Sequence, residues 1–124
     1  MALASVLIVD PADESCAVLR AVFEPRGVRV LQATAADEGL QMARHERPDV
    51  VVLDLDLELG AEPSLAAAFS STGVAPALVA VGRARRRANP PDADFLSKPY
   101  HYASLVRKIE ALLETAAPAV ADAA

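Results

Sequence analysis

The sequence has a single cysteine, Cys16, and no apolar run that approaches the length of a membrane helix. A lone cysteine excludes an internal disulfide and suits a reducing compartment. A membrane helix needs roughly 18 consecutive apolar residues, and the stretch from Leu3 to Val9 lacks the positive leader and the length of a signal peptide. We therefore expect a cytoplasmic protein with no membrane partner, in which Cys16 is buried and unreactive.

Basic side chains are also scarce. The 12 Lys and Arg residues are outnumbered by 17 Asp and Glu residues, which gives a formal net charge of −5. Because binding to nucleic acid depends largely on neutralising phosphates, this balance argues against a nucleic-acid partner. The one dense basic cluster is Arg83, Arg85, Arg86 and Arg87. Most such runs are solvated faces, and a local docking surface is the alternative.

The length and composition suit one domain with one core, since 53% of the 124 residues are apolar. We assign residues 1–114, which carry the periodic apolar patterns, to this domain. From Thr115 to Ala124 the sequence is mostly alanine, with one proline and no periodicity. The sequence therefore predicts a disordered tail over 115–124.

Short apolar runs alternate with stretches of helical periodicity, a pattern typical of βαβ units that build a parallel sheet between helices. The predicted strands are 6–9, 28–33, 50–53, 74–81 and 95–97. Helices are predicted from Pro11 to Pro25, after a capping box of Thr34 and Asp37, over the alanine-rich residues 63–69, and after Pro99.

The last two predicted helices differ in their patterns. The final helix carries Leu105, Ile109 and Leu112 on one stripe, which would pack against the sheet. The fourth helix, expected between residues 82 and 91, has almost no apolar face and ends on two prolines. We predict a short or irregular element there.

Three ionisable side chains stand where apolar runs end: Asp10 after 6–9, Asp54 after 50–53 and Lys98 after 95–97. Strands this apolar are typical of parallel sheets buried on both faces, whose carboxyl edge is where ligands bind. Mg²⁺ prefers oxygen ligands shared with phosphate, and lysine supplies a point charge. Two carboxylates and an ammonium at this edge therefore suit a metal ion and a phosphoryl group.

Taken in order, these motifs make the chain similar to the receiver domains of response regulators in two-component signalling. The resemblance rests on Val-Leu-Ile-Val-Asp at 6–10, Pro-Asp-Val-Val-Val-Leu-Asp at 48–54 and Phe-Leu-Ser-Lys-Pro at 95–99, and extends from Ser5 to Glu114. It implies a flavodoxin-like α/β fold, which is a doubly wound five-stranded parallel sheet with helices on both faces.

The resemblance also implies roles for the three side chains. Asp54 would be the phosphoacceptor, charged by a kinase histidine in a phosphorelay. Asp10 would be one acid of the Mg²⁺ site, and Lys98 would contact the phosphoryl oxygens. A cis peptide bond between Lys98 and Pro99 is usual in the family.

The chain departs from the family around the metal. Receivers usually carry a second acid directly after the first, and here that position is Pro11, whose side chain offers no oxygen. Asp13 is a candidate substitute. The resemblance assigns the remaining metal oxygens to Asp54 and to the backbone carbonyl of Asp56. We therefore expect Mg²⁺ binding to be weak or absent.

The chain departs from the family again at the end of the fourth strand. Receivers place a Ser or Thr there to bond the phosphoryl group, and the matching residue is Val81, which cannot form that bond. The aromatic residue that usually moves with this hydroxyl matches Phe95. These losses leave the nucleophile in place and indicate an atypical receiver or a pseudo-receiver.

Three functions remain open. The first is a signalling receiver that is phosphorylated by a sensor histidine kinase or phosphotransfer protein and acts on a downstream protein through Phe95 to Leu113. The second is an interaction module with the same fold that works without phosphorylation. The third is a phosphatase, since Asp54 and Asp56 resemble the Asp-x-Asp start of haloacid-dehalogenase-type enzymes. The short chain and the unexplained Asp10 argue against the third, so we expect no enzyme activity. A homodimer through the last helix is left open.

Overall fold

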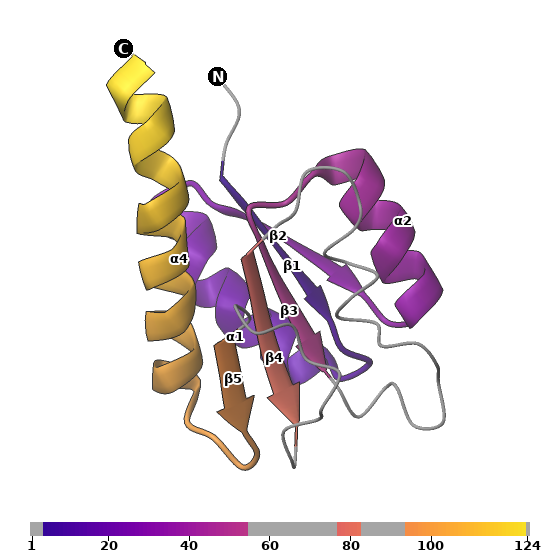
Figure 1. Ribbon diagram of the computed structural model, residues 1–124. Helices are drawn as coiled ribbons and strands as arrows, with labels where there is room; N and C mark the ends of the chain where they lie inside the picture. The colour runs from indigo at the N-terminus through magenta and orange to yellow at the C-terminus, as the bar shows by residue number, and fades with distance from the viewer. Residues whose placement is uncertain (1–3, 55–76, 83–93, 124) are drawn as a thin grey trace.

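The computed structural model describes residues 4–54, 77–82 and 94–123, which form a parallel sheet flanked by helices (Figure 1). The strands are β1 (Ser5–Val9), β2 (Arg29–Ala33), β3 (Val50–Asp54), β4 (Ala77–Gly82) and β5 (Asp94–Ser97). The helices are α1 (Asp13–Phe23), the short 3₁₀ helix η1 (Glu24–Arg26), α2 (Ala36–Glu46) and α4 (Tyr102–Ala123). The strand order is β2-β1-β3-β4-β5, which confirms the predicted doubly wound five-stranded sheet.

The central strands are apolar because helices cover the sheet on both faces. Every residue of β1 and β3 is buried, and most of these residues are valine, leucine or isoleucine, which suit a fully buried parallel strand. Val6 pairs with Val50 and Val9 with Leu53 in parallel register. Parallel pairing brings the carboxyl ends of all five strands to the same edge of the sheet.

Successive residues of β1 serve two separate core clusters, because side chains alternate between the faces of a strand. Val6 and Ile8 belong to a cluster that also contains buried residues of α1 and α4. Leu7 and Val9 belong to the other, which contains Ala43 of α2. Figure 1 accordingly shows α1 and α4 on one face of the sheet and α2 on the opposite face. Helices on both faces were predicted, and this is confirmed.

The predicted start of α1 is wrong by two residues. The helix begins at Asp13 rather than Pro11, and Ala12 before it is extended, with φ −83° and ψ 123°. The reason is a local hydrogen bond, since the backbone N–H of Ala12 donates to Asp10 Oδ1 at 2.8 Å and forms a turn before the helix. Within α1, Cys16 is buried as expected, and burial raises the pKa of its thiol.

The predicted capping box of α2 is also wrong. The N-cap residue is Ala35, which forms no side-chain cap, so Asp37 does not occupy the third helical position. Glu38 occupies that position instead, and its Oε1 accepts the backbone N–H of Thr34 at 2.9 Å and the Thr34 hydroxyl at 3.3 Å. An acidic side chain in the first turn therefore still accepts a backbone N–H at the start of the helix, but it belongs to the residue after the predicted one.

The last helix extends into the alanine-rich residues 115–124, for which the sequence predicts a disordered tail. Helix α4 continues through Thr115 to Ala123 instead of ending near Glu114. Alanine has the highest intrinsic helix propensity, so an alanine-rich segment can extend a helix without an apolar stripe.

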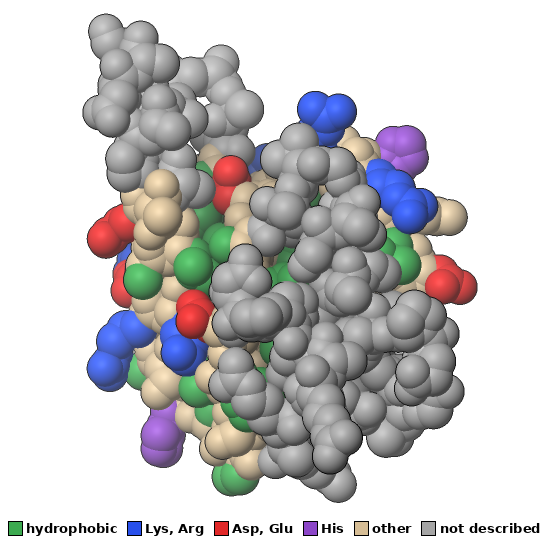
Figure 2. All heavy atoms as spheres, viewed as in Figure 1, with side chains coloured by type: hydrophobic (Ala, Val, Ile, Leu, Met, Phe, Trp, Pro, Cys, Tyr) green, Lys and Arg blue, Asp and Glu red, His purple; other side chains and the backbone are tan. Residues whose placement is uncertain are grey.

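Several predicted features lie outside the described residues: the alanine-rich helix at 63–69, the short fourth helix at 82–91 beyond Gly82, the arginine cluster and Asp56. On the face shown in Figure 2, acidic and basic side chains of the described residues are interspersed rather than gathered by sign. Within the described ranges, no helix combines the length and apolarity needed to span a bilayer.

Replacing Ile109 with alanine tests how α4 is held to the sheet. Ile109 is fully buried in the cluster beneath α1 and α4, so Ile109→Ala should lower the free energy of unfolding by roughly 2–5 kcal/mol through lost burial and a cavity. Chemical denaturation measures this change. The matched control is Arg107→Ala, an exposed position on the same helix, which should change stability by less than about 0.5 kcal/mol. Equal effects of the two substitutions would contradict this packing.

Candidate functional site

The structure brings the predicted site residues to one edge of the sheet. Asp54 is the last residue of β3, Asp10 directly follows β1, and Lys98 directly follows β5. The backbone N–H of Lys98 donates to the carbonyl of Gly82 at 2.8 Å, which continues the pairing of β5 with β4 past the end of the strand. The carboxyl ends of β1, β3 and β5 thus present all three side chains together.

Lys98 and Asp54 form an ion pair in which the ammonium contacts both carboxylate oxygens. The Lys98 ammonium Nζ lies 3.0 Å from Asp54 Oδ1 and 3.1 Å from Asp54 Oδ2. The Asp54 side chain is 8% exposed and that of Lys98 is 29% exposed, so the contact is shielded from water and salt more than a surface pair would be. The Lys98–Pro99 peptide bond is cis, as the resemblance implied.

Asp10 is held by backbone contacts at the end of β1. Its Oδ1 accepts the N–H of Ala12 at 2.8 Å, its own N–H donates to the carbonyl of Ala33 at 3.0 Å, and Gln32 Nε2 donates to its carbonyl at 3.3 Å. Burial raises the pKa of Asp10, and the negative charge of Asp54 adds to this effect. The Ala12 N–H, the charge of Lys98 and a side-chain hydrogen bond with Ser15 act in the opposite direction. The three ionisable groups are therefore close enough to influence one another.

The described residues do not fit the magnesium site that the resemblance implies. Pro11 contributes no side-chain oxygen, and Asp13 is exposed with Oδ1 accepting Gln32 Nε2 at 3.1 Å. Both oxygens of Asp54 already accept Lys98. No group of three or more His, Cys, Asp or Glu side chains in the described ranges could hold a metal ion, and the carbonyl of Asp56 lies outside those ranges.

The residue that pairs with Asp54 in the neighbouring strand is Val81. Its side chain is 1% exposed and belongs to the core. Phe95 pairs with Ala80 and packs, partly buried, against the cluster on the α2 side of the sheet. The end of β4 therefore presents an apolar side chain next to the acidic one, as the sequence comparison with the family indicated.

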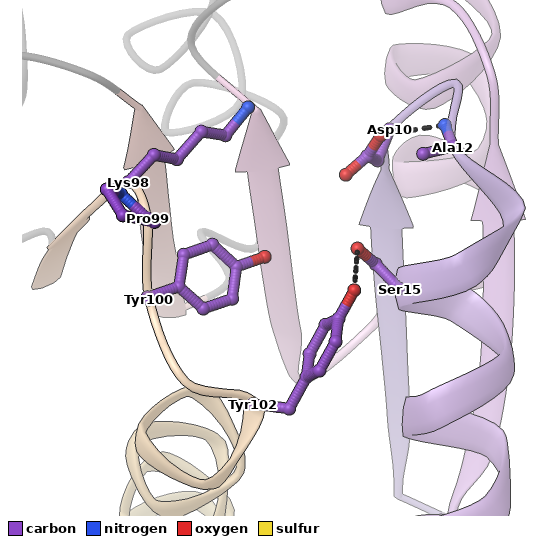
Figure 3. A pocket seen from close by; sticks show the side chains of 7 residues that line it. All are labelled: Asp10, Ala12, Ser15, Lys98, Pro99, Tyr100 and Tyr102. Carbon is purple, nitrogen blue, oxygen red and sulfur yellow. Dashed lines mark hydrogen bonds between the residues drawn. The ribbon is translucent and has the colours of Figure 1, made fainter.

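Sequence reasoning missed a pocket beside Asp10. An open pocket of about 720 Å³ is lined by Asp10, Ala12, Ser15, Lys98, Pro99, Tyr100 and Tyr102. Figure 3 shows these side chains around a common space between the start of α1 and the segment that joins β5 to α4.

One polar contact at this pocket links segments far apart in the sequence, and a ring contact lies beside it. The Ser15 hydroxyl is 3.4 Å from the Tyr102 hydroxyl, and the Tyr100 and Tyr102 rings are perpendicular with centroids 5.8 Å apart. One signal was available in the sequence, because Ser15 interrupts the buried stripe of α1 that continues through Leu19 and Phe23. A serine on a buried helical face needs a partner.

The raised pKa of Asp10 predicts a specific pH dependence of stability. A carboxyl group with a higher pKa in the folded state binds protons more tightly there, so its ionisation destabilises the fold as pH rises from the unfolded pKa, 3.8, through the folded value. Asp10→Asn removes this penalty and keeps an oxygen for the Ala12 N–H. The variant should unfold at a higher temperature than the parent near pH 7, with the difference shrinking at pH values below 3.8.

Calorimetry at several pH values measures this effect. Asp13→Asn is the control, because Asp13 is an exposed acid three residues away whose side chain accepts a hydrogen bond from Gln32. A neutral-pH destabilisation by Asp10→Asn would contradict the burial argument.

Comparisons with known proteins agree with this geometry. The sequence matches no protein-family model. Protein PilH of Pseudomonas aeruginosa is 40% identical over 53 residues, which are 43% of this chain and 44% of PilH, so the match spans less than half of that relative.

Solved structures match nearly the whole chain. A signal receiver domain from Vibrio parahaemolyticus superposes with a TM-score of 0.74 at 14% identity, covering 93% of each chain. A response regulator receiver modulated diguanylate cyclase from Pelobacter carbinolicus gives a TM-score of 0.68 at 25% identity, covering 91% of this chain and 94% of that chain. The fold of this chain is therefore that of the receiver domains of response regulators.

Proposed function

We propose that the chain is a phosphorelay receiver that accepts a phosphoryl group on Asp54 from a sensor histidine kinase or a phosphotransfer protein. The observation that carries the proposal is the contact of Lys98 Nζ with both oxygens of Asp54 at the carboxyl edge of the sheet. An ammonium in this position can stay with one oxygen while the other forms a new bond. The receiver fold of the neighbouring structures supports the same function.

The phosphoryl transfer requires the protein only to position the reacting groups and to offset the negative charge of the phosphoryl oxygens. One carboxylate oxygen of Asp54 attacks phosphorus while the bond from phosphorus to the donor nitrogen of the partner histidine breaks, which leaves an acyl phosphate on Asp54. Negative charge on the phosphoryl oxygens is the main obstacle, and Lys98 offsets it. The partner protein supplies the phosphoryl group and is otherwise unchanged when it dissociates. We therefore propose that this chain is a signalling protein and not an enzyme with its own substrate.

The same proposal assigns a cytoplasmic location and a downstream protein partner. The range 95–113 includes β5 apart from its first residue and the first half of α4, and Lys98 lies between the two. A change at the acceptor therefore reaches this surface through a short path. A homodimer through α4 is a further outcome that the same surface would allow.

A second candidate is a pseudo-receiver, which binds a partner without phosphorylation. Two observations favour it. Val81 lies beside Asp54 where a hydroxyl would be needed to follow the phosphoryl group, and the acids near Asp10 do not fit a metal site in the described part of the chain. The two candidates share the fold and differ only in whether Asp54 is modified.

Intact mass spectrometry after incubation with acetyl phosphate separates these candidates. A receiver should gain about 80 Da, the mass of one added phosphoryl group, and Asp54→Asn should abolish the gain. Asp37→Asn, an exposed acid on α2, is the control and should leave the gain unchanged. Parallel incubations with and without Mg²⁺ report whether the metal is required.

The outcomes discriminate clearly. No adduct in the parent protein under either condition would reject the phosphorelay function and favour the pseudo-receiver. An adduct that persists in Asp54→Asn would move the acceptor to another residue.

A further inference from the structure

The buried hydroxyl of Ser15 lies where the acidic edge of the sheet meets the segment that leads into α4. Ser15 is 5% exposed, and its Oγ is 3.4 Å from the Tyr102 hydroxyl. Burial raises the pKa of both Asp10 and Tyr100, and a side-chain hydrogen bond with Ser15 acts against this rise in each case. One hydroxyl on α1 therefore has three partners, two of which follow β5 in the chain.

These three partners use the whole hydrogen-bonding capacity of the Ser15 hydroxyl, which is one donor and two acceptor positions. The Asp10 carboxylate can only accept a hydrogen bond, so Ser15 donates its single proton to it. Tyr100 and Tyr102 must then donate to Ser15 Oγ. The acid therefore sets the direction of all three hydrogen bonds, and a change at Asp10 changes what Ser15 can offer to the tyrosines.

The two tyrosines are placed to pass such a change on to α4. Tyr102 is the first residue of the helix, and both rings pack, partly buried, against the core cluster that contains residues of α1 and α4. Figure 3 shows Asp10 and Ser15 on one side of the pocket and the tyrosines on the other, with the contact between Ser15 and Tyr102 joining the two sides. Because packing restrains the rings, a change in their hydrogen bonds acts on the start of the helix as well as on the side chains.

The predicted phosphoacceptor acts on the same group of side chains through its charge. Burial and then the negative charge of Asp54 raise the pKa of Asp10, so the two acids interact electrostatically. Val81, which pairs with Asp54 in the neighbouring strand, has no hydroxyl. Helix α1 instead supplies a buried hydroxyl at Ser15, which bonds Asp10.

We infer that Ser15 is a positioning residue that couples the acidic edge of the sheet to the start of α4. Its hydroxyl holds Asp10 on one side and the two tyrosines on the other, so a change of charge at the acids alters how Tyr102 anchors the helix. Phosphorylation of Asp54 would reach α4 by this route, a step that rests on the proposed function. The coupling of Asp10 to Tyr102 in the unmodified protein does not depend on that function.

A double-mutant cycle between Asp10→Asn and Tyr102→Phe measures this coupling without phosphorylation. Both substitutions keep the shape of the side chain. Chemical denaturation of the parent, the two single variants and the double variant gives the four unfolding equilibrium constants. The effect of one substitution on this constant should change about threefold or more when the other is present, as is usual within one hydrogen-bond network. In a Ser15→Ala background the two effects should become independent.

The matched control pairs Tyr102→Phe with Asp13→Asn, because Asp13 is an exposed acid at the start of α1 that does not line the pocket. These two effects should be independent in the parent. Ser15→Thr keeps the hydroxyl and should restore the coupling that Ser15→Ala removes. Amide chemical shifts of the ¹⁵N-labelled single variants give a second reading if a double variant does not fold: Asp10→Asn should move the signals of residues 102–105, and Asp13→Asn should not.

Two results of the cycle would overturn the inference. One is independence of Asp10→Asn and Tyr102→Phe in the parent. The other is a coupling that Ser15→Ala leaves unchanged, because a serine with only a structural role would lower stability without altering the interaction of the other two residues. Unmoved signals at residues 102–105 in Asp10→Asn would count against it in the same way.

Phosphorylation with acetyl phosphate separates this inference from the proposed function. In the parent, the gain of about 80 Da should be accompanied by shifts of the amide signals of residues 102–105. Ser15→Ala should keep the mass gain and lose most of these shifts, and equal shifts would overturn transmission through Ser15. No mass gain in the parent would reject the phosphorelay function, while the cycle in the unmodified protein would still decide whether Ser15 couples Asp10 to α4.

Discussion

The ion pair between the buried side chain of Asp54, at the end of β3, and the Lys98 ammonium is the interaction around which the site is built. The side chain of Asp54 is 8% exposed, and desolvating such a group without a partner costs several kcal/mol. Lys98 reaches it because β3, β4 and β5 are adjacent parallel strands and because the Lys98 N–H extends the pairing with Gly82. The topology of the sheet and the chemistry of the site therefore depend on each other.

The surroundings of the second acid, Asp10, distinguish this site from those of the receivers that the chain resembles. Asp10 is buried next to Asp54, and its pKa is raised by that burial and by the neighbouring charge. In the receivers that the chain resembles, further acids and a metal share this charge, whereas here Pro11 follows Asp10. The β1–α1 turn instead satisfies one oxygen of Asp10 with the Ala12 N–H, and a side-chain hydrogen bond with Ser15 also acts to lower the pKa of this carboxyl.

Two features of the site affect different steps of a signalling cycle. One is that Asp54 and Lys98 are present, and the other is that Val81 stands where receivers usually have a hydroxyl. The acceptor and its lysine concern whether a phosphoryl group can be added, and a hydroxyl beside them concerns how the fold responds once it is there. Under the proposed function, any response must use contacts other than that hydroxyl. The segment from Lys98 to the start of α4 is the direct route, since its tyrosines contact each other and Ser15 of α1.

Much of this protein could be read from residue order alone. The sequence predicted a buried parallel sheet, because three apolar runs each end in an ionisable residue: Asp10, Asp54 or Lys98. Their placement at one edge of the sheet could also be predicted, because strand burial and side-chain alternation are local properties. Helix boundaries were less secure. The start of α1 moved to Asp13 because of a single hydrogen bond to Asp10, and α4 continued through an alanine-rich segment without an apolar pattern.

The remaining features depend on how distant segments meet. Ser15 and Tyr102 are 87 positions apart, and no local pattern specifies that α1 and the start of α4 lie side by side across a pocket. The same holds for the contact of Lys98 with both oxygens of Asp54. The end of a strand determines which residue reaches the edge of the sheet. The packing of α1 and α4 on one face of the sheet determines which atoms of these residues face each other.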